Sequence, residues 1–334
     1  MRYEQITTQQ REDIALKKAA GASQGQIARD LGRPSCTIGR ELRRNGGAEG
    51  YRAARAQAMC GARRRGRPLK RKLDHPSLRD YINEHIVENR WSPGCISGRL
   101  AVHEKHKTDP AMQVSHETLY RFIWAEHHAG RRTLSDALWQ GRRKRRHRYS
   151  SRNHKRLHHE TTSIEQRPPV VDGRSRLGDL EADSVCGPVR SPAALVTLVE
   201  RKSRYLFIAK VADRKAATCN DALMRCFAQL PQMPRHTLTV DNGMEFSVLK
   251  PVEEKLGLKV FHAHPYHAWE RGQNEQVNGL LRKFFPKGRD LREVTQEEID
   301  RAQHLINTRP RKVLNYRTPL EVLHQDLRRV ALEN

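Results

Sequence analysis

Three acidic residues stand at positions where chemistry could use them. Asp183 lies inside a predicted strand, where an acid is disfavoured unless it is functional or paired. Asp241 ends another predicted strand, and Glu275 begins an amphipathic helix, off its apolar stripe. Clustered carboxylates repel one another unless a divalent cation lies among them, and hard oxygen ligands suit Mg²⁺ or Mn²⁺. Such metals could activate an attacking oxygen and stabilise a leaving one in phosphodiester transfer. From spacing alone, ordinary roles in a cap, a turn and an edge strand explain these acids as well.

The elements that must position these acids follow from the hydrophobic periodicity after residue 172. Strands are expected over 178–186, 193–200, 205–211, 236–241 and 259–264. Helices are expected over 212–230, 245–256 and 274–285, the last with Val277, Leu280, Leu281, Phe284 and Phe285 on one face. Three strands, a helix and then alternating strand and helix predict an α/β domain with a mixed five-stranded sheet and helices on its faces.

The positive charge of the chain is unevenly distributed. Its 334 residues carry 63 Lys and Arg against 38 Asp and Glu, a formal net charge of +25. Residues 1–160 hold 35 basic and 16 acidic residues, a net charge of +19, whereas residues 161–334 hold 28 and 22, a net charge of +6. This asymmetry predicts a polyanion-binding front half and a more neutral globular back half. A basic protein with disordered tails is the alternative.

Residues 1–48 predict an all-α helix-turn-helix domain. Thr7 or Thr8 can cap a first helix, Ser23 a second and Ser35 a third, and each is followed by apolar residues on one face. Three short helices with a tight turn between the last two are typical of a helix-turn-helix. The third helix would present polar and basic side chains to base edges and phosphates: Thr37, Arg40, Arg43 and Arg44.

A second, looser helix-turn-helix is predicted over 78–139. The segment from Ser92 to Leu100 repeats the cap and apolar spacing of the first unit, and 118–123 repeats that of its third helix. Thr118 and Arg121 would then contact DNA. The alternative is a set of generic amphipathic helices that pack on one another.

Two basic runs are predicted to be linkers. The first, over 49–77, contains an Arg-Gly-Arg-Pro core that resembles a minor-groove hook, with Arg63, Arg64, Arg65 and Arg67 as DNA contacts. The second, over 140–171, includes nine Lys and Arg and no acid between 142 and 156, a run that cannot be buried. The catalytic domain is expected over 172–330.

Several classes of protein and site are excluded by composition. No apolar stretch approaches the roughly 20 residues that a membrane span needs, and the N-terminus lacks the apolar core of a signal peptide. The six cysteines are sparse and form no C-x-x-C pair, so reduced thiols in a cytosolic protein are expected. His262, His264 and His267 are not expected to bind zinc, because their spacing alternates along a strand and no cysteine joins them.

Segments along nearly the whole chain resemble bacterial DDE transposases of the insertion-sequence-thirty (IS30) family. Those in the back half are LVERKSRYLFIAKVADRKA (198–216), TVDNGMEF (239–246), PYHAWERGQNEQVNGLLRKFFPKG (265–288) and NTRPRKVLNYRTPLEVL (307–323). The opening ITTQQREDIALKKAAGASQGQIARDLGRPSCTIGRELRRN, the RGRP run and WSPGCISGRL with VSHETLYRFI are similar to the two DNA-binding motifs of that family.

The resemblance implies an RNase-H-like (retroviral-integrase-like) catalytic domain. Asp183, Asp241 and Glu275 stand at the positions of the family triad, with 33 residues between the last two. They would be the catalytic residues and would hold two Mg²⁺ or Mn²⁺ ions. Water would first attack at the end of the mobile element, and the freed 3′-hydroxyl would then attack another phosphodiester. Asn278 and Arg282 share the Glu275 face of the helix and would contact DNA.

The resemblance also implies the partners. They are the terminal inverted repeats of the element and a target DNA, bound by a homodimer or a higher oligomer on paired ends. Neither a membrane nor a small-molecule substrate is expected, and the expected location is the bacterial cytoplasm, at the nucleoid. Two other functions stay open: a DNA-binding regulator derived from such a transposase, and a metal-dependent nuclease that cuts without joining.

A few residues depart from the family pattern or lie close to the triad in sequence. Leu180 replaces the tryptophan that the family usually has before the Glu-x-Asp of the first strand. Glu181 should point to the same side of that strand as Asp183, but it is not assigned to catalysis. Glu245 and Glu270 are assigned to a turn of helix and an exposed loop.

Overall fold

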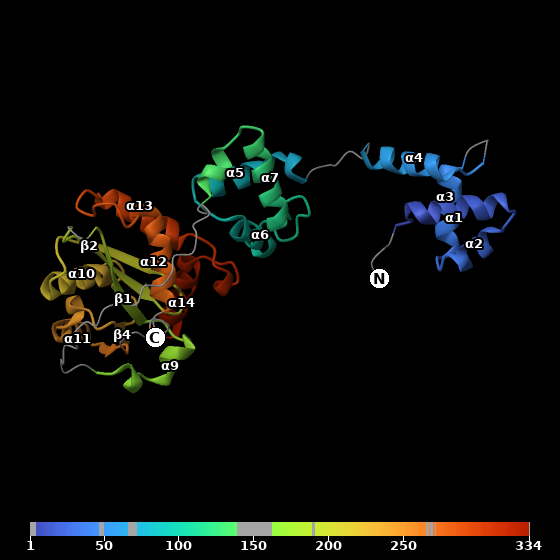
Figure 1. Ribbon diagram of the computed structural model, residues 1–334. Coiled ribbons are helices and arrows are strands. Elements are labelled where there is room, and N and C mark those ends of the chain that lie inside the picture. The colour runs from blue at the N-terminus through green and yellow to red at the C-terminus, as the bar shows by residue number, and fades with distance from the viewer. Residues whose placement is uncertain are drawn as a thin grey trace. The chain divides into compact units, whose positions relative to one another are not determined.

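The computed structural model describes residues 5–46, 50–65, 72–138, 162–188, 191–264, 267, 270 and 272–333. The chain divides into two compact units, residues 1–71 and 72–334, and each is described by itself. Figure 1 labels the helices and strands of both units. Among the described residues, no helix is both long enough and apolar enough to cross a membrane.

The first unit is helical, as predicted. Its helices are α1 (Thr8–Ala19), α2 (Gln24–Asp30), α3 (Ser35–Asn45) and α4 (Ala53–Arg65). Thr7 and Ser23 each cap a helix by exchanging hydrogen bonds with the glutamine three residues later, which stabilises the first turn. Ile14, Ile27 and Ile38, one from each of the first three helices, are fully buried against one another. The apolar spacing therefore predicted both the helices and their shared core.

The structure differs from the sequence prediction at two places in this unit. Ser35 is the first residue of α3 rather than its cap, and no side chain caps this helix. Residues 53–65, which were assigned to a linker, form α4 and pack against α1 and α3. Arg11 of α1 joins the three helices, because its Nε pairs with Glu41 at 2.8 Å and its Nη1 donates to Gln57 at 2.7 Å.

The second unit begins with a small helical segment. Its elements are the 3₁₀ turn η1 (Lys72–Asp74) and helices α5 (Pro76–Val87), α6 (Pro93–Val102), α7 (His116–His128) and α8 (Thr133–Ala137). Ser92 caps α6 and Pro93 is its first residue, as the sequence predicts. The ring of His85 lies 4.0 Å from the Tyr81 ring and 4.2 Å from the Trp91 ring, centroid to centroid. The core of this segment is thus apolar and aromatic.

This helical segment packs on the C-terminal part of the same unit. The guanidinium of Arg99, on α6, forms a two-pronged ion pair with Glu321 and donates to the backbone oxygen of Tyr316 at 3.2 Å. Gly98 faces the Tyr316 ring so closely that a Cβ there would lie 2.1 Å from a ring carbon. The region predicted as a second DNA-binding domain is therefore docked on the C-terminal part of the chain.

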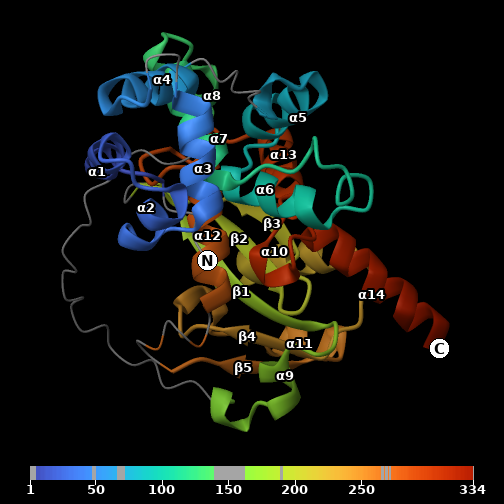
Figure 2. The same ribbon diagram turned by 90° about the vertical axis from the view of Figure 1, so that its right-hand side faces the viewer.

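A five-stranded mixed sheet forms the centre of the second unit. Its strands are β1 (Asp179–Cys186), β2 (Ala194–Glu200), β3 (Leu206–Val211), β4 (Thr237–Val240) and β5 (Lys259–His262). The spatial order is β3-β2-β1-β4-β5, which can be followed down Figure 2. β1, β2 and β3 pair antiparallel, whereas β1, β4 and β5 pair parallel. The predicted mixed sheet is confirmed.

Helices cover both faces of the sheet. They are α10 (Ala216–Ala228), α11 (Lys250–Leu256), α12 (Gly272–Phe284), α13 (Gln296–Asn307) and α14 (Pro319–Glu333), with the short α9 (Pro169–Gly173) and 3₁₀ turns η2 (Ile164–Gln166), η3 (Met244–Phe246) and η5 (Lys312–Leu314) beside them. Alternate residues of β2 enter two cores: Val196 and Leu198 pack with α10 and α11, and Leu195 and Val199 pack with α12 and α13. This two-sided burial explains why β2 is apolar almost throughout.

Candidate active site

The β1–β4 register runs toward two of the predicted acids, Asp183 on β1 and Asp241 just after β4. In the parallel β1–β4 pair, Glu181 lies beside Thr239. β4 ends at Val240, and if the register continued for two residues past Thr239, Asp241 would lie level with Asp183, on strands that are about 4.8 Å apart. Because residues two apart on a strand share a face, Asp183 projects from the same side of β1 as Glu181. The side chains of Asp183 and Asp241 are half-buried.

Helix α12 is fastened to β1 at this point by two asparagines. Asn274 Nδ2 donates to the backbone oxygen of Ala182 at 3.2 Å, and Asn278 Nδ2 donates to Asp183 Oδ2 at 2.7 Å. These asparagines are four residues apart and so share one face of the helix. Glu275 lies between them in sequence, in the first turn of α12, and its side chain is exposed. Glu275 is therefore carried by the first turn of a helix that is attached to β1 at Ala182 and Asp183.

Asn278 was predicted to contact DNA, and the structure shows a different partner for its amide. Its Nδ2 is directed to Asp183, and Thr197 Oγ1 lies 3.5 Å from its Oδ1. Ser184 N donates to the other oxygen of Asp183 at 2.8 Å. These bonds fix the orientation of the Asp183 carboxylate. The sequence signal was the polar stripe of α12, which the helical spacing located but could not pair with a partner.

Glu245 is closer to the predicted triad than the sequence suggested. Its Oε1 accepts a hydrogen bond from Ser184 Oγ at 2.5 Å. A Cβ on Gly243 would lie 2.8 Å from Glu245 Oε2 and 2.9 Å from Asp241 Oδ1, so both carboxylates lie close to this glycine. Asp241 Oδ1 also accepts from the Gly243 N–H at 3.0 Å. The backbone of the Asp-Asn-Gly turn thus lies beside the carboxylates of both Asp241 and Glu245.

Buried polar side chains surround Arg201, close in sequence to two of the predicted acids. Glu181 and Gln273 each precede a triad position by two residues, and both contact Arg201. Arg201 Nη1 pairs with Glu181, and Gln273 Nε2 donates to the backbone oxygen of Arg201 at 2.7 Å. The side chains of Arg201 and Glu181 are only 3% and 1% exposed. Burial lowers the pKa of Arg201, although the carboxylate of Glu181 opposes that effect. Glu181 therefore has a structural partner, consistent with leaving it out of the catalytic set.

Arg282 lies two turns after Glu275 on α12 and is half-buried. Its Nη1 atom is buried and, among the described residues, has no hydrogen-bond partner. Burial lowers the pKa of this guanidinium. A buried donor without an acceptor is costly, so an anionic partner would satisfy it.

Most of the residues predicted to contact DNA in the α3 helix are accessible to solvent. Arg40, Arg43 and Arg44 are exposed on α3, and Thr37 is half-buried. The other four residues predicted to contact DNA in this unit lie in or after α4: Arg63 donates to Asn45, only the backbone of Arg64 and Arg65 is described, and Arg67 lies outside the described residues.

In the second unit, Thr118 and Arg121 are exposed on α7. Arg121 forms an ion pair with Glu117 at 3.0 Å. A cleft of about 140 Å³ lies nearby, and its lining includes three cations, Arg90, Lys283 and Arg309. Burial and the charge of Arg309 lower the pKa of Lys283. This cleft adjoins α12, the helix that carries Glu275.

The histidines near the end of β5 differ from their predicted arrangement. The strand ends at His262, so the expected alternation does not extend to His264 and His267. Ring nitrogens of both residues lie close to the carboxylate of Glu270, at 2.8 Å and 3.2 Å. Among the described residues, these three side chains form a group whose candidate ligand atoms are all within 4.8 Å of one another.

Comparisons with known proteins agree with the sequence resemblance. A family model for a helix-turn-helix domain matches residues 2–45. The transposase for insertion sequence element IS1086 of Cupriavidus metallidurans is 36% identical over 98% of this chain and 96% of its own length. The transposase for insertion sequence element IS4351 of Bacteroides fragilis is 32% identical over 96% of this chain and 95% of its own. Transposase InsI for insertion sequence element IS30A of Escherichia coli K12 is 36% identical over 96% of this chain and 83% of its own.

Among solved structures, the cryo-EM structure of the simian T-cell lymphotropic virus intasome in complex with PP2A regulatory subunit B56 gamma is similar. The similarity covers 40% of this chain and 49% of that chain, at 16% identity and a TM-score of 0.34. The family assignment depends instead on the full-length relatives. Because relatives above 30% identity span nearly the whole chain, it belongs to the IS30 family of insertion-sequence transposases, which catalyse DNA transposition and bind DNA through a helix-turn-helix.

Proposed function

We propose that this transposase cleaves the ends of its element and joins them to target DNA through Asp183, Asp241 and Glu275. The observation that carries the proposal is the parallel β1–β4 register, which runs through Glu181 and Thr239, each two residues before one of the two aspartates. The attachment of α12 to β1 through Asn274 and Asn278 supports the placement of Glu275 beside them. We infer that three acids, from β1, the turn after β4 and α12, meet near the middle of the sheet.

The donor set fits two Mg²⁺ or Mn²⁺ ions. Carboxylate oxygens are the ligands that these hard cations prefer, and the set contains no sulfur or imidazole donor. Asp183 and Asp241 each use one oxygen to accept a backbone N–H, which orients the carboxylate and leaves further lone pairs. The exposure of Glu275 leaves its carboxylate accessible to an ion or to DNA. Bound there, the metal charge would activate the attacking oxygen and stabilise the leaving one.

The side chains around the acids would position the reacting strands. Asn278 holds the Asp183 carboxylate in one orientation, and positioning of this kind contributes directly to rate. Arg282 would donate its buried Nη1–H to a backbone phosphate of the bound strand. The cleft with Arg90, Lys283 and Arg309 would extend this basic path along α12.

DNA recognition would be divided between the two helical regions. The exposed Arg40, Arg43 and Arg44 on α3 fit a recognition helix that reads terminal inverted repeats. The α5–α8 segment would contact DNA nearer the site of cleavage, through Thr118 and Arg121. Joining two ends of one element requires that both be held together, so we propose a homodimer or a higher oligomer on paired ends.

The test is Mg²⁺-dependent cleavage and strand transfer on DNA that carries candidate terminal repeats. We expect Asp183→Asn, Asp241→Asn and Glu275→Gln to abolish both reactions while retaining binding in a gel-shift assay. Glu254→Gln and Asp221→Asn make the same chemical changes at exposed positions and serve as matched controls. Wild-type activity in all three triad variants would refute the site assignment.

Two results would favour the other functions. Repeat-specific binding without cleavage under any divalent metal would indicate a regulator. Cleavage that depends on the three acids but yields no joined product would indicate a nuclease. The present proposal requires both cleavage and joining.

A further inference from the structure

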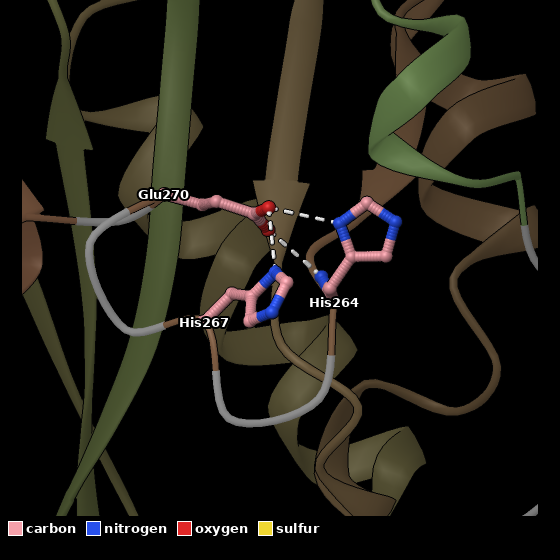
Figure 3. A group of neighbouring side chains, drawn as sticks. All are labelled: His264, His267 and Glu270. Carbon is pink, nitrogen blue, oxygen red and sulfur yellow. Dashed lines mark hydrogen bonds and ion pairs between the residues drawn. The ribbon is translucent and has the colours of Figure 1, made fainter.

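The loop between β5 and α12 carries a compact group of metal-ligand side chains. Figure 3 shows the carboxylate of Glu270 between the imidazoles of His264 and His267. Glu270 Oε1 lies 2.8 Å from His264 Nδ1 and 3.2 Å from His267 Nδ1. Glu270 Oε2 accepts the backbone N–H of His264 at 2.9 Å, which fixes the direction of the carboxylate. All three side chains are partly exposed and so accessible to a solvent ion.

A fourth residue contacts the group from a different element. Glu165, in η2, places Oε1 3.3 Å from His264 Nε2. His264 therefore has a carboxylate on each side, with Nδ1 directed to Glu270 and Nε2 directed to Glu165. A histidine that binds a metal through one nitrogen usually donates the other N–H to a carboxylate or carbonyl, which orients the ring. Glu165 occupies that position.

We propose that His264, His267 and Glu270 form a binding site for one Zn²⁺ or a similar transition-metal ion. Two imidazoles and one carboxylate are a ligand set that zinc accepts, with a fourth position left for water or another donor. Ligands at about 2.1 Å from a tetrahedral ion lie about 3.4 Å from one another. The distances of 2.8 Å and 3.2 Å to Glu270 Oε1 are shorter than this by about 0.6 Å and 0.2 Å, so a bound ion would require a small outward shift, mainly of the His264 ring. Imidazole donors disfavour Mg²⁺, so this site would be chemically distinct from the proposed triad site.

The position of the group indicates what a bound ion would do. His264 follows β5, whereas Glu270 directly precedes α12, the helix that begins at Gly272. An ion bound by both residues would link the end of β5 to the start of α12 and so restrain the first turn of that helix. That turn carries Glu275, so an effect of zinc on catalysis would follow; this last step, unlike the binding itself, rests on the proposed function.

The experiment uses the full-length chain, stripped of metal with a chelator and titrated with Zn²⁺ against a chromogenic competitor. We expect wild type to bind one more zinc ion than His267→Ala or Glu270→Gln, with Co²⁺ giving the intense visible bands of a tetrahedral site. Glu165→Gln should keep the stoichiometry but weaken zinc binding about 10- to 100-fold. His304→Ala, which removes an exposed histidine from α13, is the matched control and should bind as wild type does.

Hydrogen exchange gives a second readout. Amides in the first turn of α12 should exchange more slowly in zinc-loaded wild type, and zinc should have no such effect on His267→Ala. Equal zinc stoichiometry and affinity in wild type, His267→Ala and Glu270→Gln would overturn the proposal, since the ion would then bind elsewhere. Asp183→Asn should keep the zinc site intact. Loss of the zinc site therefore leaves the triad proposal standing, and failure of the triad leaves the zinc count unchanged.

Discussion

Replacing Arg201 by methionine should destabilise the second unit severely, because it leaves the carboxylate of Glu181 buried without its cation. Both side chains are almost fully buried, at 3% and 1% exposure. Methionine retains much of the apolar length of arginine, so the change chiefly removes the charge and its hydrogen bonds. Arg201 Nε also donates to the backbone oxygen of Val171 at 3.3 Å, and this bond would be lost as well.

The magnitude follows from the burial of the pair. Removing one partner of a buried ion pair costs about 3–5 kcal/mol, since the remaining charge cannot regain water. For a unit of this size, that corresponds to a fall in Tm on the order of 10 °C. Glu181→Gln in the same background should recover at least half of the loss, because it removes the uncompensated charge.

Urea unfolding followed by circular dichroism at equilibrium would measure the three stabilities. Arg131→Met is the control: it breaks a close Arg–Glu pair, with Glu126, whose arginine is well exposed. Little change of the urea midpoint is expected there, because solvent screens such pairs. A loss below about 1 kcal/mol in Arg201→Met, or a double variant no more stable than the single one, would refute the reasoning.

Three further outcomes are expected. Asn278→Ala should lower Mg²⁺-dependent cleavage about tenfold or more without weakening DNA binding, because a hydrogen bond to a charged group such as Asp183 is worth about 1.5–3 kcal/mol; unchanged cleavage would contradict this role. Burial lowers the pKa of His85 in the folded state, so its contribution to stability is complete above the unfolded pKa of about 6.5 and is lost as the pH falls below it. His85→Phe should therefore reduce the fall in Tm between pH 7.5 and 5.5. The same fall in the variant as in wild type would contradict this role of His85. Gly98→Leu should undock the α5–α8 segment, since even a Cβ would lie 2.1 Å from the Tyr316 ring, and native-state tryptic cleavage should become faster; a rate equal to wild type would exclude that contact as the determinant.

Local features of this fold were readable from the sequence because they depend on neighbouring residues. The caps at Thr7 and Ser23 follow from a polar residue and a glutamine three positions later. The mixed five-stranded sheet followed from the alternation of strands and helices. Helix α4 was missed because 53–65 is rich in alanine and arginine and shows no apolar stripe. Its alanine, arginine, glutamine and methionine residues are strong helix formers, so the available signal was composition rather than apolar spacing.

Contacts between segments that are distant in the sequence were harder to predict. The polar stripe of α12 indicated that Asn278 faces something other than core, but not that its partner is Asp183, 95 residues away. The grouping of His264 and His267 with Glu270 was not predicted, because the predicted strand extends past His262, where β5 ends. The triad itself stays a prediction, supported by register and helix attachment and open to the test above.

The docking of α6 on the C-terminal helices has a consequence for the length of DNA between recognition and cleavage. If Arg99 and Glu321 hold the two parts together on DNA, the chain acts as a ruler with a fixed span. The cut would then lie at a constant number of base pairs from the bases that α7 contacts, whatever their identity. Inserting one or two base pairs between them should move the cut by the same amount or abolish it, and a cut that stayed in place would show that the span is adjustable.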